Sequence, residues 1–123
     1  MIGWEALDNL WALPLEIKSL REIQQTVPPE HRHGAEYHKL EEVSENAVKE
    51  AQAIYDEMIF YIETGITDTL ILNIILDRYA NRRSLDDLAS QYSYSTRQIG
   101  RLIKRGLSEL EAKGLYETKT GGH

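Results

Sequence analysis

Four cations recur at helical spacing in the 123-residue sequence: Arg97, Arg101, Lys104 and Arg105. Side chains three and four residues apart lie on one face of an α-helix, so these four would form a basic stripe. Arginine recognises guanine through paired hydrogen bonds, glutamine recognises adenine, and lysine suits phosphate. The stripe therefore predicts a helix that enters the major groove of double-stranded DNA.

The first turn of such a helix reaches base edges, whereas later turns and flanking loops reach phosphates. We expect base contacts from four residues at its start: Thr96, Arg97, Arg101 and, where capping leaves it free, Gln98. We expect phosphate contacts from five others: Arg82, Arg83, Ser95, Lys104 and Arg105. Gly100 would let the helix approach the DNA backbone closely. The alternative interpretation is a helical hairpin whose basic face is only solvated.

Two helix starts flank a short turn before the stripe. Ser84 and Ser95 each stand three residues before a polar side chain, Asp87 and Gln98, which is the capping-box spacing. Apolar residues follow both starts at helical intervals: Leu85, Leu88, Ala89 and Tyr92, then Ile99, Leu102, Ile103, Leu107 and Leu110. We expect the two helices to cross most closely at Ala89 and Ile99. Residues 84–112 are thus predicted to form a helix-turn-helix.

Helical periodicity also fills the chain before this motif. The expected elements are helices over residues 3–12 and 14–27, a break at 27–34, a long helix over 35–64 and a helix from Thr67 or Asp68 to about Ala80. Gly65 would stop the long helix as a residue just past its end. Trp4 and Trp11 either fill the core or form an arm that docks on a partner subunit.

Histidines gather near the break, where His31, His33 and His38 lie close to Glu36. Their spacing lacks the helical geometry of strong zinc motifs, so we expect no metal. The sequence contains no cysteine, Gly-rich phosphate loop or nucleophile motif. We therefore expect neither an enzyme nor a cofactor. No apolar run is long enough to span a bilayer, and the first residues do not resemble a secretory signal.

Charge divides the chain unevenly. Residues 1–77 contain 5 Lys+Arg and 15 Asp+Glu, whereas residues 78–106 contain 7 Lys+Arg and 2 Asp+Glu. A basic segment within an acidic chain is typical of a nucleic-acid-binding module attached to a module that does not bind nucleic acid. Chance clustering is the simpler alternative.

A family resemblance rests on four short segments: residues 76–79, 84–89, 94–99 and 106–110. Together they resemble the region-4-like helix-turn-helix of sigma factors and, more closely, small phage regulators of the ArpU and RinA type. The resemblance covers roughly residues 35–112 and implies DNA-binding control of phage or prophage genes. Two departures are Gly106, where such proteins usually have alanine, and the first 34 residues, which match nothing in the family.

These observations predict an all-α protein: a long helix and helical hairpin followed by a sigma region-4-like helix-turn-helix. The expected segments are an N-terminal helical arm and Pro-rich linker (1–34), a long acidic helix (35–65), a DNA-binding domain (66–116) and a tail ending in a tag remnant (117–123). The expected partners are double-stranded DNA, RNA polymerase and a second copy bound through the N-terminal helices. The expected location is the cytoplasm of a bacterium, with a phage or prophage origin.

Two other functions are compatible with the same sequence. A DNA-packaging protein similar to a small terminase subunit would also combine a helix-turn-helix with oligomerising helices. A protein-interaction module would instead use the acidic helices to bind RNA polymerase or a repressor.

Overall fold

The computed structural model describes residues 2–31 and 33–117 of the chain. Its elements follow in the order β1 (Ile2–Gly3), α1 (Trp4–Asp8), α2 (Ala12–Gln25), the short 3-10 helix η1 (Pro29–His31), α3 (Ala35–Gly65), α4 (Thr69–Tyr79), α5 (Leu85–Tyr92), α6 (Thr96–Ala112) and β2 (Tyr116–Glu117). Helices dominate, and the predicted all-α class is confirmed. The two very short strands, which pair in parallel, are an addition that the sequence did not indicate.

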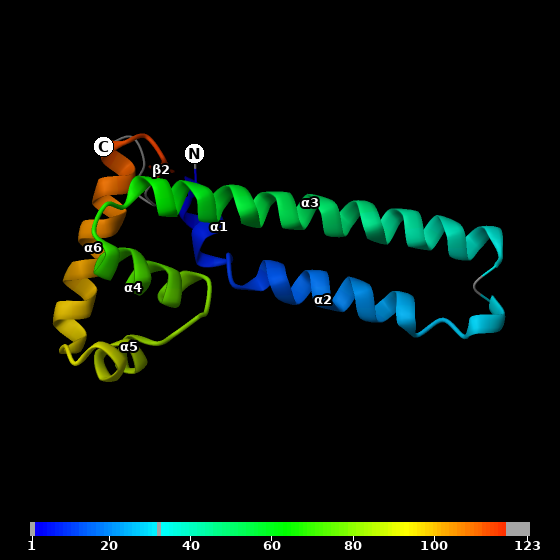
Figure 1. Cartoon of the computed structure of the whole chain (residues 1–123), viewed down its shortest axis with the longest axis horizontal. Coiled ribbons are helices and arrows are strands. Elements are labelled where there is room, and N and C mark those ends of the chain that lie inside the picture. The colour runs from blue at the N-terminus through cyan, green and yellow to red at the C-terminus, as the bar shows by residue number, and fades with distance from the viewer. Residues whose placement is uncertain (1, 32, 118–123) are drawn as a thin grey trace. The chain divides into compact units, whose positions relative to one another are not determined.

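The chain divides into two compact units, one made of Met1–Trp11 with Glu57–His123 and one made of Ala12–Asp56. The first, called unit 1, contains α4, α5 and α6, which pack around a shared core (Figure 1). The side chains that fill this core are branched and apolar: Ile71, Ile74, Ile75, Leu88, Ile99, Ile103 and Leu110. Residues from all three helices thus meet where the sequence predicted apolar stripes.

Two glycines allow close packing between helices: Gly106 on α6 and Gly65 at the end of α3. A Cβ at Gly106 would lie 2.7 Å from Cγ2 of Ile71 and 3.0 Å from Cγ1 of Ile75, so α6 packs closely against α4 at this point. A Cβ at Gly65 would collide with the side chain of Leu110 and lie 2.9 Å from Cδ1 of Leu115. Gly65 is the last residue of α3 and is needed for packing, which corrects its predicted role as a residue past the helix end.

Residues 1–11 belong to unit 1. The backbone N–H of Ile2 donates to the carbonyl of Leu115 at 2.7 Å, and Ile2 pairs with Tyr116 in the parallel strands. Leu7 and Leu10 are fully buried. Strand pairing and apolar burial therefore join the first eleven residues, which were predicted as part of an N-terminal arm, to the C-terminal unit.

The second unit, called the hairpin, consists of α2, η1 and residues 35–56 of α3. Within it α2 lies along α3, and Nε2 of Gln24 donates to Oε1 of Glu45 at 3.4 Å (Figure 1). Ser44, Val48 and Ala51 of α3 are buried, whereas α2 has no buried residue. The predicted break near residues 27–34 corresponds to η1 and its flanking turns.

The limits of α3 and α4 agree closely with the sequence. The helix expected over residues 3–12 is shorter, since α1 spans only Trp4–Asp8, and the helix expected over residues 14–27 begins and ends two residues earlier, since α2 spans Ala12–Gln25. The long helix was expected over residues 35–64, and α3 spans Ala35–Gly65. Of the two residues proposed to cap the next helix, Asp68 is the cap, since its Oδ1 accepts the N–H of Ile71 at 3.0 Å. Among the helices of the described residues, none combines the length and apolar character needed to cross a membrane. The predicted tail lies outside the described residues beyond Glu117.

The packing at Gly106 can be measured with a matched pair of variants in α6. Gly106→Ala and Gly100→Ala gain the same helix propensity of about 1 kcal/mol, but a Cβ at Gly100 meets no atom within 4 Å. Overpacking at position 106 should therefore make Gly106→Ala less stable than Gly100→Ala by about 1–3 kcal/mol. Urea unfolding followed by tryptophan fluorescence reports on unit 1, which holds both tryptophans. Equal stabilities would contradict the assigned close packing.

Candidate nucleic-acid interface

The candidate interface begins with the capped start of α6. Oγ of Ser95 accepts the N–H of Gln98 at 3.1 Å, and Oε1 of Gln98 accepts the N–H of Ser95 at 2.9 Å. This complete capping box fixes the first turn of α6. Gln98 was expected to contact a base only if capping left it free, and it is not free, because its side-chain carbonyl oxygen accepts the cap hydrogen bond. The hydroxyl of Ser95 still has its proton to donate to a phosphate.

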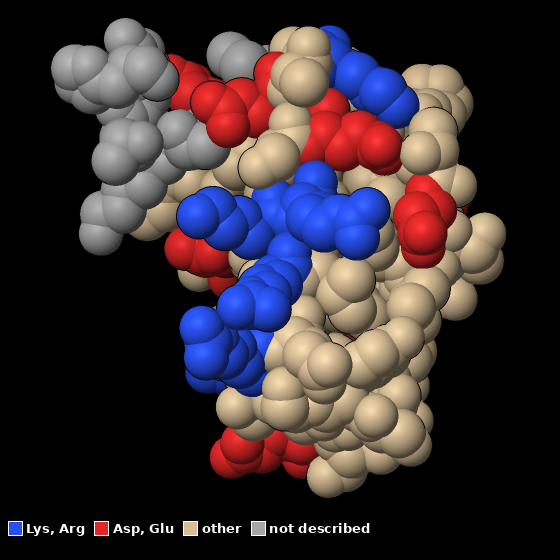
Figure 2. All heavy atoms as spheres, turned by 90° about the vertical axis from the view of Figure 1, so that its left-hand side faces the viewer, with Lys and Arg blue, Asp and Glu red and all other residues tan. Residues whose placement is uncertain are grey.

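The two faces of α6 differ sharply. Ile99, Ile103, Gly106 and Leu110 are buried, and this stripe fixes the rotation of the helix about its axis. The four predicted cations, Arg97, Arg101, Lys104 and Arg105, are all exposed. Figure 2 shows Lys and Arg side chains gathered on the face of the molecule that carries α6, with Asp and Glu around them. The structure thus brings these four cations together in the way that the spacing predicted.

The cations of this α6 basic face are not neutralised within the part of the chain that the structure describes. No ion pair involves Arg97, Arg101, Lys104 or Arg105 there. Glu109, the nearest acid on α6, instead accepts the backbone N–H of Thr67 at 2.7 Å. The stems of Arg101, Lys104 and Arg105 line a shallow hollow with Ser108. Such a surface of uncompensated cations attracts a polyanion.

Thr96 and Gly100 border the basic face near its start. Thr96 is the first helical residue and its side chain is exposed, as a base contact requires. Gly100 is half-buried, yet a Cβ there would meet open space. The internal packing of the protein therefore gives no reason for glycine at this position, in contrast to Gly106.

Arg82 and Arg83 lie elsewhere, in the connection between α4 and α5. The guanidinium of Arg82 stacks over the ring of Trp11 at 3.9 Å from its centroid. Figure 1 shows this connection leaving α4 at the end away from α6 and returning to α5. The structure therefore pairs Arg82 with Trp11, although the sequence grouped Arg82 and Arg83 as phosphate contacts. Contact between Arg82 and Trp11 links residues 71 positions apart, and no local pattern could reveal it.

Asp77 holds α5 against α4. Its Oδ2 accepts hydrogen bonds from the hydroxyl of Tyr92 at 2.6 Å and from Nε2 of Gln91 at 3.2 Å, and its Oδ1 accepts one from Nδ2 of Asn81 at 3.0 Å. Burial and the bond to Asp77 raise the pKa of Tyr92 to about 12. Sequence reasoning missed this cluster, since only the Asp77–Asn81 spacing of four residues was visible locally.

The turn between α5 and α6 is tight. Ser93 has a left-handed backbone with φ 59°, and the N–H of Tyr94 donates to the carbonyl of Ala89 at 3.0 Å. Ser84 caps α5 by accepting the N–H of Asp87 at 3.1 Å, but among the described residues only Ser95 forms the full capping box. Leu88 is fully buried, whereas Ala89, where the crossing was expected, is half-buried.

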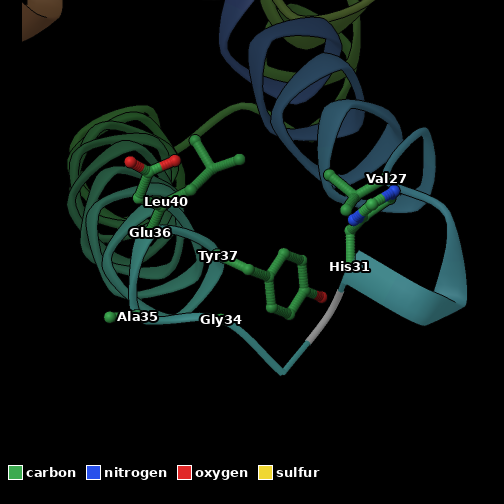
Figure 3. Close-up of a pocket in the computed structure, with 7 residues that line it drawn as sticks. All are labelled: Val27, His31, Gly34, Ala35, Glu36, Tyr37 and Leu40. Atoms are coloured by element: carbon green, nitrogen blue, oxygen red, sulfur yellow. The ribbon is translucent and has the colours of Figure 1, made fainter.

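A second hollow lies in the hairpin, between the end of α2 and the start of α3. Val27, Gly34, Ala35 and Leu40 contribute its apolar lining, and Figure 3 shows the Tyr37 ring extending from α3 toward His31. Across residues 2–31 and 33–117, no three His, Asp or Glu side chains come together to hold a metal ion. This hollow therefore offers no defined chemistry comparable to that of the α6 basic face.

Comparison with models of protein families, with curated protein sequences and with solved structures finds no match for this chain.

The Asp77–Tyr92 contact predicts a defined alkaline response. The folded pKa of Tyr92 is raised from 10.0 to about 12, so its stabilising effect is complete below pH 10 and is lost as pH rises toward 12. Tyr92→Phe should lower stability at pH 7 by about 1–2 kcal/mol and should lose less stability between pH 10 and 12 than the wild type. Urea unfolding at several pH values measures both effects. Tyr94→Phe, on the exposed turn, is the control, and equal behaviour of the two variants would contradict this assignment.

Proposed function

We propose that this protein is a sequence-specific DNA-binding transcriptional regulator that reads the major groove with α6. The observation that carries the proposal is the α6 basic face, which is exposed and free of ion pairs in the described part of an acidic chain. Helices that read DNA present their first turns to base edges. In this arrangement Thr96, Arg97 and Arg101 contact bases.

Phosphate contacts come from both ends of the same face. Ser95 donates its hydroxyl proton at the start of α6, and Lys104 and Arg105 neutralise phosphates about two and a half turns later. Arg82 is assigned no contact in this arrangement because its guanidinium stacks on Trp11, whereas Arg83, in the same connection before α5, keeps its predicted phosphate contact outside the α6 basic face. The buried stripe from Ile99 to Leu110 holds the cations in a fixed orientation, which favours recognition over diffuse attraction.

The family resemblance supports a phage or prophage origin for the regulator. Two of its four segments, residues 84–89 and 94–99, coincide with the beginnings of α5 and α6. Gly106 departs from the alanine of the family pattern, and in this chain Ile71 and Ile75 fill the space that an alanine methyl group would need. RNA polymerase is a further proposed partner, and bacterial cytoplasm is the proposed location.

Removing the two arginines nearest the start of α6 tests the base contacts. Each bidentate arginine–guanine pair contributes about 1–3 kcal/mol of discrimination, so Arg97→Ala with Arg101→Ala should weaken binding to the preferred duplex at least about 30-fold. Fluorescence anisotropy at fixed salt measures the change. The control removes two exposed lysines of the hairpin, Lys18→Ala with Lys49→Ala, and should bind within a factor of about two of the wild type. Equal losses in both double variants would contradict specific recognition by α6. The two phosphate-neutralising cations of α6, Lys104 and Arg105, also contribute about −2 to the predicted slope of log K against log salt.

Gly100 provides an independent test of close approach to DNA. A Cβ at this position finds open space within the protein, so Gly100→Ala should raise stability by up to about 1 kcal/mol. The same methyl group would stand between α6 and the groove, and we expect binding to the preferred duplex to weaken several-fold. Paired urea unfolding and anisotropy measurements separate the two effects. A variant that is more stable and binds as tightly as the wild type would show that α6 does not approach DNA closely there.

A further inference from the structure

The hairpin leaves a set of apolar side chains uncovered. Ile23 of α2 is 49% exposed, and on α3 Val43 is 59% and Ile54 is 43% exposed. Leu40 adds a fourth side chain at 37% exposure. Leu15 of α2, at 55% exposure, is a fifth, but it points away from α3. Exposed leucines and isoleucines are common singly, whereas the other four form a patch whose position on the helices needs an explanation.

Helix geometry places these residues on one side of the hairpin. Each residue turns an α-helix by about 100°, and the contact stripe on α3 is marked by its buried Ser44, Val48 and Ala51. Val43 and Ile54 lie about 80–100° from the centre of that stripe. On α2 the half-buried stripe of Leu13, Ile17, Leu20 and Gln24 faces α3, and Ile23 lies about 80° from its centre in the same rotational sense.

Because α2 and α3 run antiparallel, equal rotation in the same sense brings both flanks to the same side of the pair. This side, called the open face, contains Ile23, Leu40, Val43 and Ile54, with Ala47 between the last two. The opposite side contains the exposed or half-buried polar residues Arg21, Gln25, Glu41, Glu45, Gln52 and Asp56, with Pro14 at its α2 end. A two-helix unit with one apolar side and one polar side is half of a four-helix bundle.

We propose that the open face binds the open face of a second copy of this chain, forming a homodimer through a four-helix bundle. The area supports this occupant. Residues 35–56 of α3 extend over roughly 33 Å and α2 over roughly 21 Å, and each helix is about 10 Å wide, giving on the order of 500 Å² before side-chain relief is counted. A stable interface buries about 800 Å² on each partner. A face of this size, apolar on both helices, is self-complementary under a two-fold axis.

The charges around the open face set the salt dependence of the dimer. Glu16, Glu36 and Glu50 border the apolar side chains, so the two copies bring like charges together. Salt screens such repulsion, and the dimer should therefore strengthen as salt rises. DNA binding has the opposite salt dependence, so the two properties are separable.

Mass measured by light scattering without DNA tests the dimer, and does so whether or not the protein binds DNA. The wild type should have twice the chain mass of 14.2 kDa. Val43→Glu with Ile54→Glu should halve that mass while circular dichroism remains helical. Ala53→Glu, which adds one such charge on the outward side of α3, should remain a dimer. A wild-type monomer or ring, or a dimer that survives the double variant, would overturn the proposal.

A cross-linking experiment covers the case in which the charged variant fails to fold. The chain has no cysteine, so a single introduced thiol is selective. Ala47→Cys on the open face should give a covalent dimer with a short bis-maleimide, whereas Ala53→Cys should remain monomeric on a denaturing gel. Cross-linking of both variants, or of neither, would contradict the open face as the interface. If the chain is a monomer that binds a basic partner protein through this face, neither variant should cross-link.

Discussion

The close packing of α6 against α4 at Gly106 determines the arrangement of unit 1. A methyl group at this position would press on Ile71 and Ile75. Because glycine has no side chain, the backbone of α6 lies closer to α4 than it would with a larger residue. This approach buries Ile99, Ile103 and Leu110 along the same face of α6. The opposite face must then point outward, and it carries the cations. Packing on one side of α6 thus sets the chemistry on the other.

Further contacts make that orientation rigid. The capping box of Ser95 and Gln98 fixes the first turn of α6, and the carboxylate of Asp77 ties α5 to α4 through Tyr92 and Gln91. Residues 1–11 add strand pairing and two buried leucines to the same unit. A surface that reads bases must hold its side chains within narrow limits, and these contacts meet that requirement. The acidic hairpin contributes an apolar face instead, which suits association of two copies.

Local sequence patterns predicted much of this structure. Helix limits followed from periodicity and from side chains such as Ser95 and Asp68, because a cap involves residues only three positions apart. The outward placement of Arg97 and Arg101 followed from the apolar stripe that begins at Ile99, because residues of that stripe occupy the opposite face of the helix. The missed features all depend on contacts between distant residues. Arg82 was grouped with α6 by charge, but its place is determined by Trp11. The roles of Gly65 and Gly106 depend on which side chains approach them from other helices, which no local pattern reveals.

Selection of bound duplexes from a random double-stranded DNA pool tests the central claim most directly. The account predicts that the wild-type chain enriches a defined sequence motif and that Arg97→Ala with Arg101→Ala removes the enrichment at positions read by α6. Recovery of a random pool by the wild type, or an unchanged motif with the double variant, would contradict DNA recognition by the α6 basic face.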